Sequence, residues 1–363
     1  MFLLSLCLIS TAYGIILISS VTRYEPRNFV AVQIGAVVIG IILFILFSYI
    51  DIDLIAAQSK ILFVISILFI STLLIWGVGD AINRRAWLRF FGTISVQPGE
   101  IVKVPFIIIM ARMIANYKER KTLNSFVSLL QIMLVFMVMF GAVLYISDDI
   151  GTALIYLGIM AVMLYIGGLK LRWFALGAGA LAAVSPLVWL YFFEDRHRAR
   201  ILAPFPALSD MVYNLERWTW QPDRSVAAIS SGGFTGWGLG NGRISPTIPA
   251  VETDFIFAVA GEELGFVGGI LIVLLLSIIV ARCIYVGTKS NNPLGMLVCT
   301  GVAAMFIIQP IMNIGMALGF LPVIGIPLPF FSYGGSSIVT YFAAAGIVSG
   351  IKMRPKPVRF RGM

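Results

Sequence analysis

Long apolar runs dominate the chain and are separated by short polar segments. A helix needs about 20 predominantly apolar residues to cross the hydrocarbon core of a bilayer. Ten runs of roughly that length predict membrane spans at about 2–20, 28–50, 60–77, 98–116, 124–146, 149–167, 172–193, 254–282, 295–318 and 335–352. The pattern therefore predicts an all-α polytopic membrane protein with about ten transmembrane helices.

The basic residues between the runs predict the orientation of the chain. Lysine and arginine are more frequent in alternate connections, and cytoplasmic loops carry this excess in membrane proteins. The favoured segments hold Lys60, Lys118, Arg120, Lys121, Lys170, Arg172, Arg282, Lys289 and the tail residues Lys352, Arg354, Lys356, Arg359 and Arg361. Both termini are then cytoplasmic, and the basic tail at 353–363 is predicted to contact anionic lipid. One large extracellular loop, about 194–253, joins spans seven and eight.

The composition supports one integral membrane domain over residues 1–363. Hydrophobic residues make up 60% of the chain and charged residues 12%, with a mean hydropathy of +0.98, which excludes a soluble globular protein. The net charge of +9 follows membrane topology, so no nucleic acid is expected as a partner. A single histidine excludes a multi-histidine metal site, and the three cysteines lie in or beside apolar runs, as buried thiols do.

Two outer segments have unusual composition. Six glycines lie between Ser230 and Gly242, where they let backbone approach a neighbour closely. Because Phe234, Trp237 and Leu239 interrupt these glycines, we expect a packed segment rather than a flexible linker. The second segment, 319–337, is apolar and rich in proline and glycine, so it cannot form a regular helix. At membrane depth such backbone must be buried in protein or line a cavity, which makes it a candidate wall for a lipid-linked ligand.

Acidic residues at the start of the eighth span are the candidate chemistry. Asp254 follows a proline-rich loop at the predicted outer interface, and partial burial makes a carboxylate a better general base. A structural alternative is that Thr253 or Asp254 caps the helix that starts there. Glu262 and Glu263 lie about two turns further in, where hydrogen bonding is a more frequent role than catalysis.

Glu100 and Lys103 lie three residues apart on the fourth span, so they share one helix face and can pair. Two interpretations stay open. The pair can hold helices in register, or Lys103 can help to bind an anionic head group.

Four stretches resemble signatures of the SEDS family (shape, elongation, division and sporulation). Thr253–Gly265 and Asn313–Ser337 are similar to its two longest motifs, and the second is closer to the RodA branch than to the FtsW branch. Gln97–Lys103 resembles the family's Gln-Pro-Ser-Glu-x-x-Lys, and Asp149–Leu154 resembles its Asp-Leu-Gly-Thr-Ala-Leu. The chain departs from the usual pattern at Glu252, where the family has histidine, at Gly99, where it has serine, and in the register of arginine before Trp87.

The resemblance implies a multi-pass peptidoglycan glycosyltransferase of the bacterial plasma membrane. Such enzymes polymerise lipid II on the outer face during elongation and cell-shape maintenance, using undecaprenyl-pyrophosphate-linked glycan and a class B penicillin-binding protein as partner. The family's essential aspartate maps to Asp254, and its fourth-span pair maps to Glu100 and Lys103. With the motif segments and nearby arginines, the candidate substrate-binding residues are Glu100, Lys103, Arg85, Arg200, Thr253, Ser332, Gly334, Gly335, Ser336 and Ser337.

Asp254 is expected to act as the general base, and a divalent cation (Mg²⁺ or Mn²⁺) held by Asp254 is a possible cofactor. Two other classes of protein remain open. A lipid II flippase also needs many spans and buried acids, and Glu262 and Glu263 suit it. A scaffold that only recruits the penicillin-binding protein would leave these acids without a role.

Overall fold

Ten long helical segments form one bundle in the computed structural model, which describes residues 1–23, 25, 28–79, 85–90, 94–191, 193, 195–205 and 216–353. Within that part, nine helices are long and apolar enough to cross a bilayer, and the 17-residue α7 occupies the predicted fourth position. The segments are α1 (Phe2–Val21), α2 (Phe29–Tyr49), α4–α5 (Ser59–Ser71 and Leu73–Trp76), α7 (Lys103–Glu119), α8 (Phe126–Gly141) with a π-turn (Ala142–Ile146), α9 (Ile150–Gly167), α10 (Leu171–Tyr191), α14 (Ile256–Lys289), α15 (Pro293–Ala317) and α16 (Gly335–Met353).

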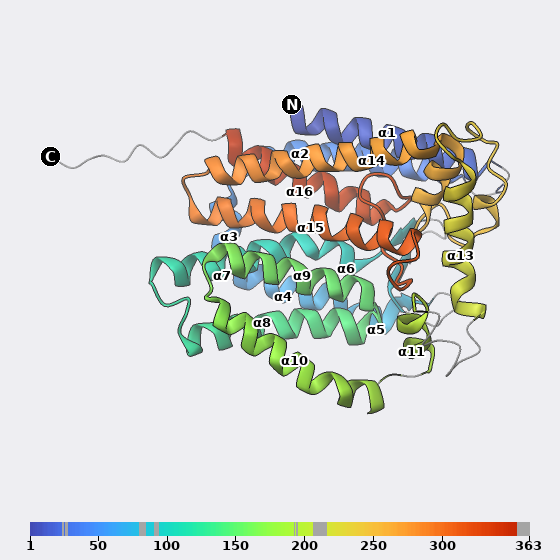
Figure 1. The fold of residues 1–363 in the computed structure, drawn as a ribbon. Helices are drawn as coiled ribbons and strands as arrows, with labels where there is room; N and C mark the ends of the chain where they lie inside the picture. Colours follow the sequence, from blue (N-terminus) through green and yellow to red (C-terminus); the bar gives the residue numbers. More distant parts are fainter. Residues whose placement is uncertain are drawn as a thin grey trace.

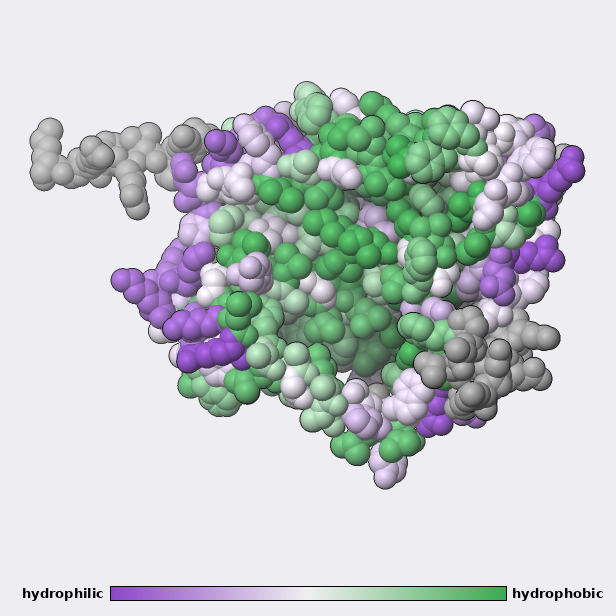
Figure 2. Space-filling view, in the orientation of Figure 1, coloured by the Kyte–Doolittle hydropathy of each residue, from purple (hydrophilic) through white to green (hydrophobic). Residues whose placement is uncertain are grey.

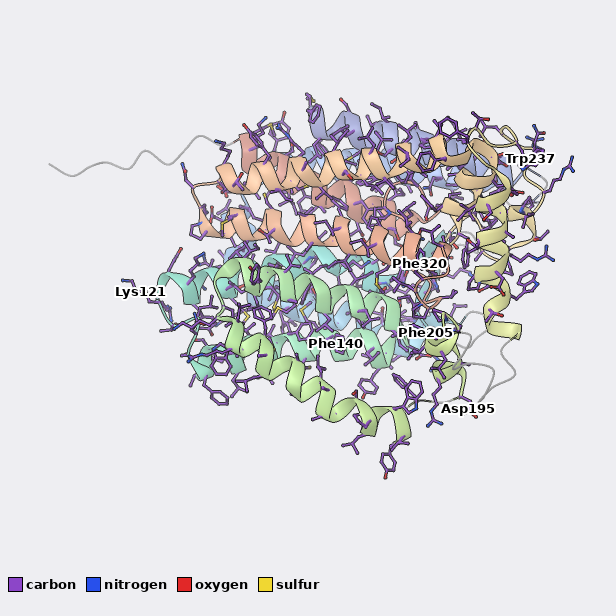
Figure 3. All side chains as sticks on the ribbon, in the orientation of Figure 1. Lys121, Phe140, Asp195, Phe205, Trp237 and Phe320 are labelled. Carbon is purple, nitrogen blue, oxygen red and sulfur yellow. The ribbon has the colours of Figure 1, made fainter. Side chains whose placement is uncertain are left out.

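The bundle has two different ends (Figure 1). One, which we call the loop end, carries α11 (Asp195–Leu202), α13 (Glu216–Ser231), the small β-sheet and the segment 319–334. The other, which we call the tail end, carries the α14–α15 turn and the last residue of α16. Figure 3 places Lys121 at the tail end and Trp237 at the loop end. An apolar belt separates hydrophilic patches at the two ends in Figure 2, as expected of a spanning bundle.

The elements differ from the sequence prediction in several places. The fourth span is broken at Val102 into α6 (Pro98–Ile101) and α7, where the sequence predicted one helix over 98–116. The eighth span runs to Lys289 rather than to 282, and it contains a non-helical residue, Gly265, at φ 65°. Three short strands, which the apolar pattern did not reveal, form an antiparallel sheet in the order β1 (Gly77–Val78), β2 (Trp87–Phe90) and β3 (Ile94–Val96). The short helix α3 (Ile52–Ala57) was also not predicted.

The two helices α15 and α16 form the buried centre of the bundle. In each of them 72% of the most apolar stretch is buried, whereas the corresponding fraction in α10 is zero. α15 packs against α14, α9 and α7, and α16 packs mainly against α2. The segment that joins α15 to α16 therefore connects the two most buried of these helices. Cys7, Cys283 and Cys299 are buried free thiols, as expected.

Small residues let α2 and α16 approach closely. A Cβ atom added at Gly346 would lie 2.5 Å from the Phe44 carbonyl oxygen, and one added at Gly350 would lie 2.8 Å from the Ser48 carbonyl oxygen. Small residues four apart on one helix face are a common device for bringing backbones together in a bilayer, where packing rather than water drives association. The contact fixes the position of α16, whose first turn contributes to the site described below.

Replacing Gly346 by alanine should therefore destabilise the bundle by about 1–3 kcal/mol, because overpacking forces the two backbones apart. Gly35→Ala is the matched control, since a Cβ there meets nothing within 4 Å and alanine favours the helix. Thermal unfolding in detergent should show a lower midpoint for Gly346→Ala and an equal or higher midpoint for Gly35→Ala. Equal midpoints for the two variants would contradict the close packing of α2 on α16.

Candidate functional site

A tight turn precedes α14 and carries Asp254. Ala250 adopts φ 55°, and its carbonyl oxygen accepts hydrogen bonds from the Thr253 and Asp254 amides at 3.1 and 2.9 Å. The helix begins at Ile256 with Phe255 as its N-cap, so the prediction that Thr253 or Asp254 caps it is wrong. Asp254 itself is half-buried at the loop end.

Three consecutive carbonyl groups of this turn are held from α15 and the segment after it. The Glu252 oxygen accepts from the Tyr333 amide at 2.8 Å, and the Thr253 oxygen accepts from the Ser332 hydroxyl. The Asp254 oxygen accepts from Nδ2 of Asn313 at 2.8 Å. The backbone on both sides of the Asp254 side chain is therefore fixed by parts of the chain 59 to 81 residues away.

The proline-rich segment 319–334 folds back into the protein. It has no regular helix, and Ile326, Leu328, Phe330 and Phe331 are buried, which confirms the predicted irregular, buried wall. Its backbone lies so close to α1 that a Cβ at Gly14 would be 2.6 Å from Phe331.

Phe330 sits in the left-handed region at φ 70°, which is strained for a bulky residue. Its ring packs among Phe306, Tyr341 and Phe342, with ring centroids 5.3 to 5.9 Å away, and this packing offsets the strain.

The remaining signature stretches meet the same wall. The side chain of Gln97 donates from Nε2 to the Asp149 carboxylate at 2.6 Å, and its backbone amide donates to the Ser336 hydroxyl at 2.9 Å. Asp149 caps α9 through the Thr152 amide at 2.9 Å. A Cβ at Gly151 would lie 2.7 Å from the Ile324 oxygen, so the start of α9 abuts the proline-rich segment. Four stretches that lie far apart in the sequence thus form one polar assembly at the loop end.

Gln33 of α2 completes this assembly. Nε2 of its side chain donates to the Ser332 carbonyl oxygen at 3.0 Å, and Oε1 accepts from the Gly334 backbone amide at 3.1 Å. Sequence reasoning assigned no role to Gln33, Gln97 or Asn313. A polar side chain inside an apolar span is the signal that could have singled out Gln33 and Asn313, although it does not reveal their partners.

Glu100 and Lys103 form the predicted ion pair, and both are almost fully buried, at 1% and 0% exposure. The second carboxylate oxygen of Glu100 has no hydrogen-bond partner among the described residues. Nearby, the Tyr156 hydroxyl donates to the Gly99 carbonyl oxygen at 2.9 Å and ties α9 to α6. This burial favours a structural ion pair, which joins α6 to α7 within the fourth span. A role of the pair in keeping helices in register and a role of Lys103 in binding a head group stay predictions.

The glycine-rich run packs onto the first turns of α14, which confirms a packed segment. Oε1 and Oε2 of Glu262 accept three backbone N–H groups, from Arg243, Ile244 and Ser245, at 2.7 to 2.8 Å. Glu263 accepts from the Ser20 hydroxyl of α1 at 2.6 Å. Both side chains are thus used in hydrogen bonding, as expected.

Close approach explains the glycines of this run. A Cβ at Gly232 would lie 2.0 Å from the Gly261 oxygen, and one at Gly236 would lie 2.2 Å from the Glu263 oxygen. Only glycine fits at these two positions, because in both cases the neighbouring atom is helix backbone.

The other predicted residues lie at the same end of the bundle. Arg85 is exposed just before β2, and Arg200 is half-buried in the last turn of α11. Gly334, Gly335, Ser336 and Ser337 form the start of α16. The basic tail after Met353 lies outside the described residues.

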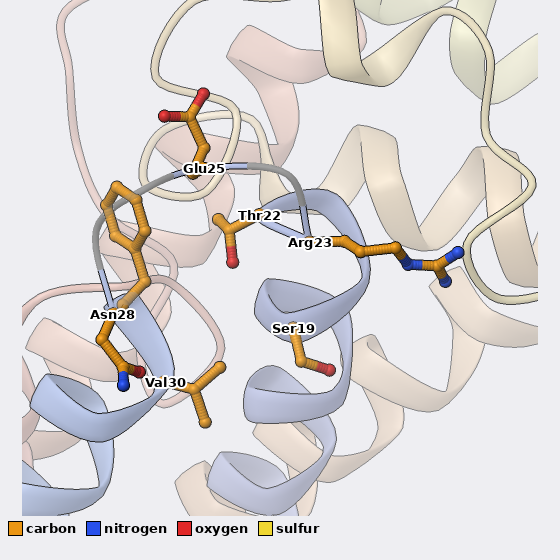
Figure 4. A pocket seen from close by; sticks show the side chains of 7 residues that line it. Ser19, Thr22, Arg23, Glu25, Asn28 and Val30 are labelled. Carbon is orange, nitrogen blue, oxygen red and sulfur yellow. The ribbon is translucent and has the colours of Figure 1, made fainter.

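A shallow hollow of about 340 Å³ lies beside this assembly, between the ends of α1 and α2. Ser19, Thr22, Arg23, Glu25 and Asn28 line it with two apolar neighbours. In Figure 4 the Arg23 and Glu25 side chains point away from one another, so their charges do not converge on a common ligand.

No metal cage is built into the described part of the chain. Groups of three or more histidine, cysteine, aspartate or glutamate side chains that could hold an ion are absent there. Mg²⁺ is usually bound through one or two carboxylates together with substrate phosphates. A cation at Asp254 would therefore take most of its ligands from a bound substrate, and its presence stays a prediction.

Comparison with known proteins places this assembly in a family. The model of FtsW, RodA and SpoVE cell cycle proteins matches residues 1–356. The chain belongs to the FtsW/RodA/SpoVE family. It is therefore a multi-pass bacterial membrane protein.

Relatives from both branches of the family match nearly the full length. The chain is 32% identical over 351 residues to a probable peptidoglycan glycosyltransferase FtsW of Bacillus subtilis, covering 94% of this chain and 86% of that one. It is 29% identical over 331 residues to the peptidoglycan glycosyltransferase MrdB of Escherichia coli, covering 89% and 85%. These matches leave the choice between branches open.

Two solved structures share the fold. One is a chain described under "structural coordination of polymerization and crosslinking by a peptidoglycan synthase complex", with a TM-score of 0.80, 26% identity and 96% of each chain covered. The other is the rod shape determining protein RodA of Thermus thermophilus, with a TM-score of 0.67, 24% identity and 96% and 95% covered. The bundle is therefore the fold of this family.

The buried ion pair makes a prediction about stability. Lys103→Met should cost about 3–5 kcal/mol, because it leaves the Glu100 carboxylate buried and uncompensated. The double variant Glu100→Gln with Lys103→Met should recover most of this loss in a thermal unfolding experiment. A double variant no more stable than Lys103→Met would contradict a structural pair. If Lys103 also binds a head group, the double variant regains stability without regaining activity.

A second prediction concerns Glu262. Glu262→Ala leaves three N–H groups of the loop without their acceptor, at roughly 1–3 kcal/mol each. We expect the loop to detach locally, and trypsin to cut after the exposed Arg243 much faster than in the original protein. Asp223→Ala, which removes an exposed carboxylate from α13 at the same end, is the control and should leave the rate of cleavage unchanged. Unaltered cleavage in Glu262→Ala would show that Glu262 does not hold the loop.

Proposed function

We propose that this protein is a peptidoglycan glycosyltransferase that polymerises lipid II on the outer face of the bacterial plasma membrane. The observation that carries the proposal is the half-buried Asp254, held in a rigid turn where four family signatures meet at one end of the bundle. The activity printed for the FtsW and MrdB relatives supports it. Outside the large loop 194–253, basic residues are more frequent in the connections and tail at the tail end, which supports placing the loop end outside.

In the proposed reaction, Asp254 is the general base. The acceptor is the GlcNAc 4-hydroxyl of lipid II, and the donor is the growing glycan on undecaprenyl pyrophosphate. The carboxylate takes the hydroxyl proton while the oxygen forms a bond to the anomeric carbon. The bond from that carbon to the pyrophosphate oxygen breaks, and the pyrophosphate leaves with the electron pair. Because this leaving group needs no proton, one carboxylate suffices, unlike the two of a glycosidase.

The pyrophosphate that leaves develops charge and needs cations close to it. Arg85 and Arg200, both at the loop end, are the proposed side chains. Lys103 is fully buried against Glu100, so it would have to leave that pair to reach a phosphate. A divalent cation shared between Asp254 and the phosphates would supply the same positive charge.

We further propose an elongation role in the manner of RodA, based on Gly325-Ile-Pro-Leu-Pro329, together with a class B penicillin-binding protein as partner. The description of the similar synthase complex, which joins polymerisation to crosslinking, supports a partner of that kind. Lipid II binding then involves Thr253 and the first turn of α16, whereas the Ser332 hydroxyl is used to hold the Thr253 carbonyl group.

A lipid II flippase is the alternative. A flippase needs polar groups along the whole depth of the membrane. Here Glu262 and Glu263 are used by the loop and by α1, and the polar assembly is concentrated at one end. These observations favour the enzyme.

Asp254→Asn tests the proposal directly. The variant should fold and stay in the membrane, because the bonds to its backbone are kept, but polymerisation should fall by at least about 10²-fold, the lower range for loss of a general base. The assay uses purified protein in detergent with lipid II and a class B penicillin-binding protein, and it measures glycan chain formation. Detergent abolishes sidedness, so chains formed there cannot arise from flipping.

Glu252→Gln is the matched control, since it changes a half-buried carboxylate two residues away. It should keep most of the activity. Wild-type polymerisation by well-folded Asp254→Asn would reject the proposed function.

A further inference from the structure

We propose that Asn313 is a positioning residue for the reaction, which fixes the Asp254 carboxylate by clamping its backbone. This inference rests on the proposed function of Asp254. Asn313 lies one turn before the end of α15, in the most buried part of the bundle, and its side chain is 0% exposed. It is out of contact with solvent, so its effect on the reaction must pass through the groups that it holds.

A single amide group fastens two irregular segments. Nδ2 of Asn313 donates to the Asp254 carbonyl oxygen at 2.8 Å and to the Ile326 carbonyl oxygen at 2.7 Å. One bond holds the turn before α14 and the other holds the proline-rich segment. Neither carbonyl group accepts a helix or sheet hydrogen bond, so the side-chain amide of Asn313 supplies the donor that regular secondary structure would provide.

The orientation of the amide is forced by chemistry. Both partners are carbonyl oxygens, which only accept, so the group that faces them has to be the NH₂. Oδ1 of Asn313 is then left buried without a partner among the described residues. A buried acceptor without a partner carries a penalty, which the two hydrogen bonds donated by Nδ2 have to offset.

These bonds bear on Asp254 more directly than on any other acidic side chain. The Asp254 amide donates to the Ala250 oxygen and its carbonyl accepts from Asn313, so the peptide groups on both sides of its Cα are held. Ser332 holds the preceding carbonyl, that of Thr253. Removing the Asn313 clamp allows the Cα to move, and a displacement of about 1 Å in a catalytic group can cost about 10²-fold in rate.

α15 also provides a matched control. Gln309 lies one turn before Asn313, is equally buried at 0% exposure, and also leaves its amide oxygen without a partner in the described part of the chain. Its Nε2 donates to the Tyr341 hydroxyl at 3.1 Å, rather than to the backbone of the Asp254 turn. Gln309→Ala therefore removes the same kind of group from the same helix without releasing Asp254.

The experiment compares Asn313→Ala, Gln309→Ala and Asp254→Asn in the detergent polymerisation assay with lipid II, together with thermal unfolding. We expect Asn313→Ala to lose roughly 30- to 100-fold in kcat with KM changed less than about threefold, because positioning acts on the chemical step. Gln309→Ala should lose less than about threefold in kcat at a similar loss of thermal stability. Equal losses of kcat in the two alanine variants, or wild-type kcat in Asn313→Ala, would overturn the inference.

Ser332→Ala is a milder variant for the case that Asn313→Ala does not fold. It removes the donor to the Thr253 carbonyl, and it should lower kcat by several-fold with KM unchanged if the clamp positions the base. A rise in KM alone would instead assign Ser332 to substrate binding and would contradict the clamp. Asp254→Asn distinguishes failure of the proposed function from failure of the positioning role. Polymerisation by Asp254→Asn rejects the proposed function. Loss of polymerisation in Asp254→Asn together with a wild-type kcat in Asn313→Ala rejects only the positioning role.

Discussion

The structure depends on one constraint, which is that irregular backbone at membrane depth must find its hydrogen bonds inside the protein. The turn before α14 and the proline-rich segment after α15 are both irregular, and each supplies partners to the other. The carbonyl groups of Glu252, Thr253 and Asp254 accept from Tyr333, Ser332 and Asn313. Because the bonds are mutual, neither segment can move without leaving polar groups of the other unsatisfied, which makes the pair rigid.

Strain is concentrated around this pair of segments. Of the four described non-glycine residues with positive φ, Ala250 lies in the turn, Phe330 in the proline-rich segment and Asp148 beside the cap of α9, while Lys121 lies at the tail end. Such conformations persist only where the surroundings determine them, and they cluster at functional sites. The aromatic packing of Phe330 against α15 and α16 is one such determinant. Rigid backbone at this end suits an enzyme that has to hold one carboxylate against a large lipid-linked sugar.

The helices were predictable from the sequence because their signal is local. Twenty consecutive apolar residues specify a span whatever surrounds them, and the spans were placed to within a few residues, except where Val102 breaks the fourth and where the eighth extends to Lys289. The sheet at 77–96 was missed because its strands have two to four residues, too few to show an alternating pattern.

The acidic residues of the site could be predicted from the sequence, but the polar side chains that hold its backbone could not. Glu100, Asp254 and Glu262 are conspicuous in apolar surroundings, and Glu100 and Lys103 pair as their spacing indicated. Gln33 and Asn313 act through contacts with residues 13 to 301 positions away, which a single sequence does not encode in any local pattern. A role of Asp254 as a helix cap was plausible by residue type, but the helix begins at Ile256 with Phe255 as its N-cap.

The central claim is that the Asp254 carboxylate, on backbone fixed by α15 and the segment after it, takes the proton from a sugar hydroxyl at the loop end. A structure of the protein with a non-reactive lipid II analogue measures this directly. We expect the GlcNAc 4-hydroxyl oxygen to lie within about 2.6–3.2 Å of an Asp254 carboxylate oxygen. The hydrogen bond from Asn313 to the Asp254 carbonyl oxygen should be kept. A sugar bound at the tail end, or an Asp254 carboxylate that points away from the hydroxyl into lipid, would contradict it.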